Sequence, residues 1–225
     1  FGAATKFSGL QLDAPKTYEA IALLGVTSTG DAEGEVLQRC TVDEAALTPQ
    51  RLAQVAQQFT GAIRQVPPMH SALKKDGKAL YEYARAGVEV ERPARDVFIS
   101  ALNLALTHTE QAQAAIKIRV TCSKGTYIRT LGEDIGQALG CGAHLVFLRR
   151  VETGGLGLEG CVTLAQLEAC DDAQRLAWVQ PVQTLLAGHT VITLAEEDAG
   201  RFLSGVRRRG PWPDAAAVAV YGEHP

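Results

Sequence analysis

Aromatic and cationic side chains recur together at four separated places, a combination suited to contacting RNA. Tyr18 follows Lys16 by two residues, and Tyr127 precedes Arg129 by two. Aromatic rings stack on the bases of single-stranded or loop RNA, while Lys and Arg hold its phosphate backbone. A strand tyrosine is more often sheet packing, so each pair is weak evidence by itself. The recurrence favours RNA recognition.

The most informative of these places is "CSKGTYIRTLGEDIG", residues 122–136. It predicts a strand ending at Cys122, a Ser-Lys-Gly turn and a helix beginning near Thr126. Such a turn presents backbone N–H groups and the positive end of a helix dipole to an anion. Lys124 and Arg129 add charge. A capped helix with two surface cations explains the same residues equally well, so the stretch alone leaves a phosphate role open.

Two further stretches place cations next to a rigid turn or at the end of an apolar strand. In "VPPMHSALKKDGKALYEYA", residues 66–84, a Pro-Pro turn precedes His70, Lys74 and Lys75. The lysines suit phosphate contact, whereas a buried or capping role is the commoner one for a histidine. The stretch "CGAHLVFLRR", residues 141–150, is an apolar strand that ends in two arginines. Any single basic run is more often solvated surface.

One carboxylate, Asp13 in "LDAPKTYEA", raises the question of a nucleophile. It lies five residues ahead of Tyr18. A carboxylate there could attack a substrate, or it could shape a turn by bonding to its own backbone.

Strands and helices must position these residues. Hydrophobic alternation predicts strands at 18–24, 97–106, 115–123 and 144–154, with a turn at "GDAEG", residues 30–34. Helical spacing predicts a helix from Pro49, capped by Thr48 and stopped at Gly61, and another capped within 123–126 and ending at Gly140. Shorter helices are expected at 80–87 and 163–170, and short strands and turns follow Gly188. The fold class predicted is α+β, with a mixed, largely antiparallel sheet flanked by helices.

Composition places the chain among ordinary globular proteins. It has 225 residues, 46% hydrophobic and 21% charged, and a net charge of −3, which argues against wholesale coating of nucleic acid but allows a local basic patch. No membrane-spanning run is present. The five cysteines form no CxxC pair, which favours reduced thiols. Cys141 and His144 have ligand spacing, but no second pair completes a metal site.

Six stretches, taken in order, resemble the bacterial tRNA pseudouridine-55 synthase family, the TruB type. They begin at residue 1 and run beyond residue 150: "FGAATKFSG", "DAPKTYEA", "LGVTSTGDAEGEV", "VPPMHSALKKDGKALYEYARAG", "SKGTYIRTLGEDIG" and "CGAHLVFLRR". The tail "AGRFLSGVRRRG" is similar, less specifically, to the family's small PUA-like RNA-binding domain. The resemblance implies the pseudouridine synthase fold, with a catalytic domain at 1–180 and a partial PUA-like domain at 181–225.

The resemblance also implies an activity and a substrate. Enzymes of this family flip a uridine out of the T loop of tRNA at position 55, detach the base from C1′ of its ribose and rejoin it through C5. They use no cofactor and no metal. We therefore expect the T-stem loop of tRNA as partner, a monomer, no membrane association and a cytoplasmic location.

Site residues follow from the matching motifs. Tyr18 matches the tyrosine that stacks on the flipped base and is proposed to move a proton. Tyr127 and Arg129 match a Tyr-x-Arg pair of the active site, the arginine being expected to pair with the catalytic aspartate. Leu148 matches an apolar residue that lines the pocket. Looser matches predict RNA contacts for three further residues, Lys16, His70 and Lys74.

The family's nucleophile motif, G-x-L-D-P-x-A-x-G, does not occur in this sequence. Its expected place is just upstream of Phe1, so both ends of the chain are expected to be cut and the chain alone to be inactive. Asp13 matches a position with no catalytic role. Two alternatives remain: a non-catalytic module that binds or folds tRNA, and a phosphate-binding enzyme of small metabolites that uses residues 123–129 alone.

Overall fold

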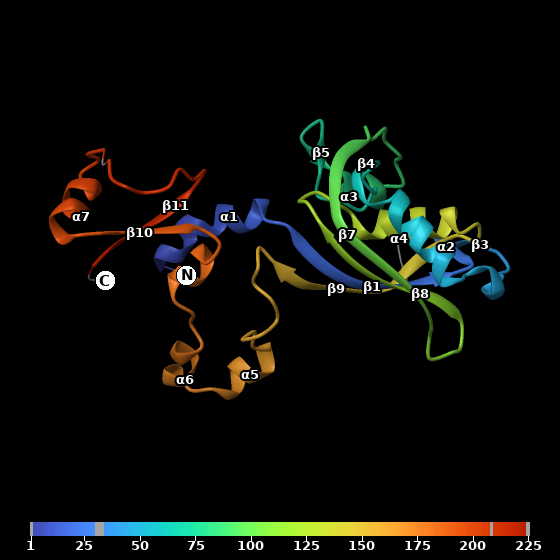
Figure 1. Ribbon diagram of the computed structural model, residues 1–225. Coiled ribbons are helices and arrows are strands. Elements are labelled where there is room, and N and C mark those ends of the chain that lie inside the picture. Colours follow the sequence, from blue (N-terminus) through green and yellow to red (C-terminus); the bar gives the residue numbers. More distant parts are fainter. Residues whose placement is uncertain (1, 30–33, 208, 224–225) are drawn as a thin grey trace. The chain divides into compact units, whose positions relative to one another are not determined.

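The computed structural model describes residues 2–29, 34–207 and 209–223. These residues form two compact units (Figure 1), each considered by itself below. The larger unit is Leu12–Glu159, and the smaller one combines Phe1–Gln11 with Gly160–Pro225. These units are defined by packing and not by function, so the boundary expected between residues 180 and 181 stays a prediction.

A five-stranded antiparallel sheet organises the larger unit, with the strand order β4-β7-β8-β1-β9. Its strands are β1 (Lys16–Leu24), β4 (Gly61–Gln65), β7 (Arg95–His108), β8 (Ala114–Cys122) and β9 (Ala143–Thr153). The four strands predicted from hydrophobic alternation are all present. Together with the helices they confirm the α+β fold with a largely antiparallel sheet.

Two helices pack on one face of this sheet, and their apolar stripes meet the inward-facing strand residues (Figure 1). They are α2 (Pro49–Gln58) and α4 (Ile128–Ala138). The core that they close contains the following fully buried side chains: Val55, Ile99, Ile116, Ile118, Val120, Leu131 and Ile135. The predicted start of α2 is confirmed, because the Thr48 hydroxyl accepts a hydrogen bond from the Arg51 N–H.

The N-terminal cap predicted for α4 was one residue or more too early. Tyr127 occupies the N-cap position and makes no side-chain capping bond. The hydroxyl of Thr126 instead donates to the carbonyl of Ser123, so it closes the preceding turn. At the other end Leu139 is the C-cap, and Gly140 follows with φ 86°, a conformation that favours glycine.

Short elements connect the main ones. Strands β2 (Val26–Ser28) and β3 (Val36–Arg39) form a hairpin, and the turn predicted at "GDAEG" falls largely on residues 30–33, outside the described residues. The 3-10 helix η2 (Glu44–Ala46) precedes α2. After the Pro-Pro break, the two-residue strands β5 (Lys74–Lys75) and β6 (Lys78–Ala79) lead into α3 (Leu80–Arg85), as the sequence predicted for this short helix.

The smaller unit holds short helices and one pair of strands. Its elements are η1 (Gly2–Phe7), α5 (Leu164–Ala169), α6 (Asp172–Ala177), η3 (Val182–Leu186), β10 (Thr190–Leu194), α7 (Glu196–Leu203) and β11 (Val218–Gly222), and α1 (Ser8–Asp13) spans the limit between the units. Of the short strands and turns predicted after Gly188, β10 and β11 are present, but the prediction was wrong at α7. Three acidic residues in its first turn and Arg201 in its last favour that helix. β10 and β11 pair in parallel.

No helix in the part of the chain that the structure describes is long and apolar enough to span a membrane.

Candidate nucleic-acid site

Tyr18 lies half-buried on β1, the strand between β8 and the edge strand β9, against the core. It is paired with Val120 of β8 and with Arg150 of β9, while Ala20 is paired with Leu148. Because directly paired residues of antiparallel strands point to the same face, Tyr18, Leu148 and Arg150 share the face on which α4 packs. Leu148 is 45% exposed, so this face is apolar and open beside the tyrosine.

A break in the strand register adjoins Tyr18. The pairing of β1 with β9 shifts between Thr17 and Tyr18. Such bulges bend a strand and re-aim the neighbouring side chains, and they are common next to functional sites.

The first turn of α4 is held in place by a buried amide. The backbone N–H of Tyr127 donates to Oε1 of Gln65 over 3.0 Å, and Nε2 of Gln65 donates to the carbonyl of Tyr127 over 3.3 Å. Gln65 is only 2% exposed. One buried side chain therefore bonds both the N–H and the carbonyl of Tyr127. This N–H is already used and does not offer itself to an anion.

Arg129 connects α4 with the loop that follows the two prolines. Its Nη2 donates to the carbonyl of His70 over 2.8 Å. The structure thus brings two of the predicted site residues together, although through the backbone of His70 and not through its imidazole. The contact also limits where the guanidinium can lie.

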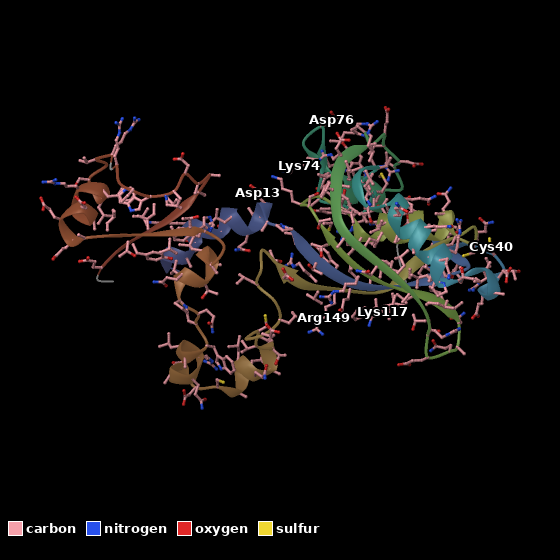
Figure 2. The ribbon with its side chains drawn as sticks, viewed as in Figure 1. Asp13, Cys40, Lys74, Asp76, Lys117 and Arg149 are labelled. Atoms are coloured by element: carbon pink, nitrogen blue, oxygen red, sulfur yellow. The ribbon has the colours of Figure 1, made fainter. Side chains whose placement is uncertain are left out.

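Lys16 and Lys74 belong to other elements, β1 and β5. The ammonium of Lys16 donates to the carbonyls of Leu12 and Ala14, at 2.6 and 2.7 Å, at the end of α1. Carbonyls at a helix C-terminus favour such a cation. Lys74 is exposed on β5, and Figure 2 shows it in the part of the unit that also holds Asp76. RNA contacts for both lysines stay predictions.

A comparison of the sequence with models of known protein families identifies the family of this chain. Residues 1–128 match "TruB family pseudouridylate synthase (N terminal domain)", and residues 129–187 match "tRNA pseudouridylate synthase B C-terminal domain". The chain belongs to the TruB family. The resemblance predicted from the six stretches is confirmed.

Curated relatives of the TruB family agree. The tRNA pseudouridine synthase B of Verminephrobacter eiseniae is 67% identical over 226 residues, which cover all of this chain and 68% of the relative. The enzyme of the same name from Ralstonia nicotianae is 56% identical over 99% of this chain and 71% of the relative. These relatives are tRNA pseudouridine synthases that extend beyond the matched part.

Among solved structures, the fold is similar to a chain from a crystal structure of a Cbf5-Nop10-Gar1 complex. The TM-score is 0.60 at 24% identity, over 90% of this chain and 52% of that one. A chain from an H/ACA RNP bound to a substrate RNA containing 2'-deoxyuridine gives a TM-score of 0.55 at 21% identity, over 90% and 51% of the two chains. This TruB chain therefore spans about half of each solved chain and shares its fold.

Asp13 is engaged with a cation and does not bond its own backbone. Its carboxylate accepts a hydrogen bond from Nζ of Lys124, and this contact lowers the pKa of Asp13, through the hydrogen bond first and the positive charge second. Both side chains are exposed. The carboxylate is therefore ionised at neutral pH and paired with Lys124, one of the two cations of the turn and helix at residues 122–136.

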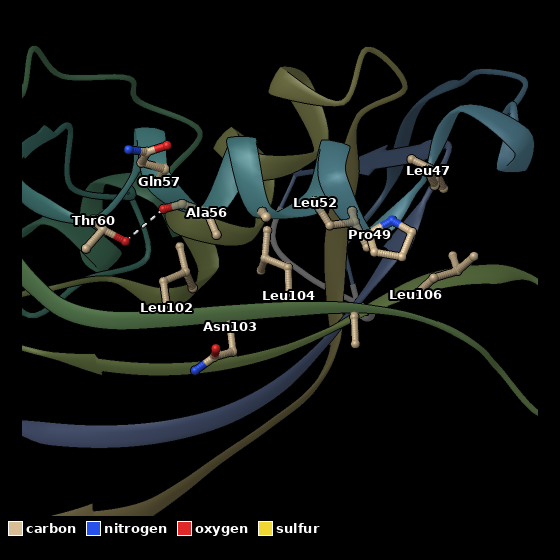
Figure 3. Close-up of a pocket in the computed structure, with 12 residues that line it drawn as sticks. Leu47, Pro49, Leu52, Ala56, Gln57, Thr60, Leu102, Asn103, Leu104 and Leu106 are labelled. Atoms are coloured by element: carbon tan, nitrogen blue, oxygen red, sulfur yellow. Dashed lines mark hydrogen bonds between the residues drawn. The ribbon is translucent and has the colours of Figure 1, made fainter.

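A wide groove of the TruB chain lies elsewhere, between α2 and β7 (Figure 3). It measures about 670 Å³ and is lined mostly by aliphatic side chains, among them Leu52, Leu102 and Leu104. None of the predicted site residues lines it. In the described residues no group of three or more His, Cys, Asp and Glu side chains could hold a metal ion.

Two residues with a direct bearing on the site, Gln65 and Arg150, escaped the sequence analysis as individuals. In the sequence Gln65 stands two residues ahead of the first of two prolines, with nothing in its neighbourhood to mark it as buried. Arg150 was noted only as part of a basic pair, and its place opposite Tyr18 depends on strand register. Both roles come from contacts between distant segments.

We expect Gln65→Leu to destabilise the larger unit by about 1–3 kcal/mol, because the part-buried N–H and carbonyl of Tyr127 lose their partner. Gln65→Glu retains the acceptor oxygen and is the matched control for side-chain size. Urea unfolding followed by far-UV circular dichroism measures both. Equal stability of the leucine variant and the parent protein would show that the Gln65 side chain does not hold the start of α4.

Proposed function

We propose that this chain is the RNA-binding and base-positioning part of an enzyme that converts uridine 55 in the T loop of tRNA to pseudouridine. In that reaction the target base leaves the loop, its bond from N1 to C1′ breaks, and a bond from C5 to C1′ forms. The hydrogen on C5 passes to solvent, and N1 gains a proton. No cofactor or metal takes part.

The observation that carries this proposal is the shared sheet face of Tyr18, Leu148 and Arg150 in a chain of the TruB family. Tyr18 stacks on the flipped base and moves a proton, and Leu148 covers the base from the neighbouring strand. Arg150, opposite Tyr18, offers a cation to a phosphate of the loop.

The start of α4 supplies the electrostatic part of the proposed site. Arg129 pairs with the catalytic aspartate, and a guanidinium near a carboxylate keeps it ionised. Tyr127, held by Gln65, forms the wall next to it. His70, Lys74 and Lys16 contact the RNA loop around the target base. The tail at 181–225 serves as a partial PUA-like RNA-binding domain of a cytoplasmic, monomeric enzyme.

The nucleophile of the proposed reaction lies outside these 225 residues. Asp13 does not take that role, because the G-x-L-D-P-x-A-x-G motif does not surround it and it matches a family position with no catalytic role. The same observation supports the alternative of a non-catalytic module that binds or folds tRNA, since the chain on its own then retains binding without turnover.

A position-specific assay tests the proposed reaction in the longer protein. T-arm RNA with tritium at C5 of uridine 55 alone should release tritium to water, and RNA labelled at another uridine of the T arm should not. Release from the other uridine with none from position 55 would contradict the assignment of the substrate position.

A further inference from the structure

The segment 65–70 contacts the start of α4 at both of its ends. At the first end, the Gln65 side chain bonds the N–H and the carbonyl of Tyr127, at 3.0 and 3.3 Å. At the other end, the His70 carbonyl accepts from Nη2 of Arg129 at 2.8 Å. The chain between the two contacts contains two consecutive prolines, whose φ angles are fixed. A stiff piece of backbone therefore separates them.

The segment 65–70 is itself held by the sheet and by a neighbouring arginine. Gln65 is the last residue of β4 and is paired with Arg95 of β7. Nη1 of Arg92 donates to the carbonyl of Pro67 over 3.1 Å. Both Gln65 and Pro67 are buried. The segment can therefore act as a support for α4, because these contacts fix its own position without involving that helix.

Arg129 is the residue whose position the segment 65–70 affects most. An arginine side chain has several rotatable bonds, so its guanidinium takes many positions unless contacts restrict it. The bond to the His70 carbonyl uses one of its five N–H groups. Because the same segment also bonds the backbone of Tyr127, two residues earlier, it fixes both the start of the helix and the guanidinium that this helix carries.

We propose that Gln65 is a positioning residue for the formation of pseudouridine, acting through Tyr127 and Arg129, an inference that rests on the proposed function. With the Gln65 amide in place, the guanidinium of Arg129 stays beside the carboxylate of the nucleophile and keeps it ionised. Without that amide, the first turn of α4 moves relative to the His70 carbonyl, and the guanidinium spends part of its time away from the carboxylate. The pKa of the nucleophile then rises.

Gln65→Met in the longer protein tests this role through the pH dependence of single-turnover tritium release. Methionine has a similar length and no charge, and it removes both bonds to Tyr127. The acid limb of the profile should move to higher pH by roughly 0.5–1 unit, because a more distant guanidinium lowers the pKa of a carboxylate less. At pH values below the limb, the rate should therefore fall about threefold to tenfold. The affinity for tRNA should be unchanged.

Val55→Ala is the control for a loss of stability alone. Val55 is fully buried in α2, and its truncation leaves a cavity without removing a bond to the start of α4. Its acid limb should coincide with that of the parent protein. A Gln65→Met profile lowered by the same factor at every pH, with the limb unmoved, would show a merely structural role and overturn the proposal. Equal shifts of the limb in both variants would overturn it as well.

The 225-residue chain reports on the same contacts without any catalysis. In a ¹⁵N-labelled chain, the Tyr127 amide should exchange with solvent roughly tenfold faster or more in Gln65→Met, since its acceptor is gone. The Nε signal of Arg129, assigned by its absence in Arg129→Lys, should show a lower order parameter in Gln65→Met. An Arg129 signal as ordered as in the parent chain would contradict the coupling between Gln65 and the guanidinium.

Pro68→Gly keeps both bonding groups and loosens the chain between them, so it decides the question where Gln65→Met does not fold. The acid limb should shift in the same direction by a smaller amount, and an unmoved limb would overturn the role of the segment 65–70 as a stiff support. Failure of the proposed function looks different. A longer protein that releases no tritium from uridine 55 removes that function, while the order of Arg129 in the 225-residue chain still decides whether Gln65 positions it.

Discussion

Replacing Tyr18 with alanine in the longer protein should lower the rate of pseudouridine formation by at least about a hundredfold, the lower range for a residue that transfers a proton. Affinity for tRNA should fall by only about tenfold, because stacking on one base is a single contribution among many contacts. The half-buried place of Tyr18 on β1, next to Leu148 and opposite Arg150, is the basis for this expectation. Single-turnover tritium release and a separate binding titration measure the two quantities.

Tyr18→Phe separates the two roles assigned to the ring. Phenylalanine preserves stacking and core packing but has no hydroxyl, so it should bind tRNA like the parent protein and lose most of the rate. Equal losses of rate and affinity in Tyr18→Ala would show that the residue is a docking surface only.

Gly136→Ala should destabilise the larger unit by about 2–3 kcal/mol, against the usual stabilising effect of about 1 kcal/mol for this change in a helix. A methyl group on Gly136 would lie 2.5 Å from Cβ of Ala143 and 2.5 Å from the carbonyl carbon of Gly142. Those atoms belong to the turn from α4 to β9, whose Cys141 and Gly142 N–H groups both donate to the Gly136 carbonyl. The backbone must move to make room. The strand that begins at this turn, β9, carries Leu148.

Gly200→Ala in α7 is the matched control, since nothing lies within 4 Å of a Cβ at that position. It should leave stability unchanged or raise it by up to about 1 kcal/mol. Hydrogen exchange resolved by residue reports each unit separately. Unchanged protection of α4 and β9 in Gly136→Ala would contradict the close approach of this helix to the turn.

The fold could be predicted from the sequence where a local pattern decides it. Alternation located β1, β7, β8 and β9, and the Thr48-Pro49 pair located the start of α2, because one buried face or one cap suffices in each case. The pattern failed at α7, where short apolar runs suited a strand as well as a helix. It also placed the cap of α4 too early, since Gln65, far away in the chain, bonds the backbone of Tyr127.

The candidate site, like the fold, was only partly predictable from the sequence. The resemblance to the TruB family predicted Tyr18, Tyr127, Arg129 and Leu148 as site residues, which stays a prediction, but it did not predict the interactions that fix them. Neither the bond from Arg129 to the His70 carbonyl nor the pair of Asp13 with Lys124 has a counterpart in local sequence. The latter pair joins residues 111 positions apart. Interactions of that kind depend on the sheet register, which the folded chain alone reveals.

Tritium release by this 225-residue chain, measured beside its binding of T-arm RNA, tests the central claim most directly. The chain should bind the RNA and release no tritium from C5 of uridine 55, whereas the longer protein should do both. Release by the 225-residue chain at the rate of the longer protein would contradict a site whose nucleophile lies outside these residues, and loss of that release in Asp13→Asn would assign the nucleophile to Asp13.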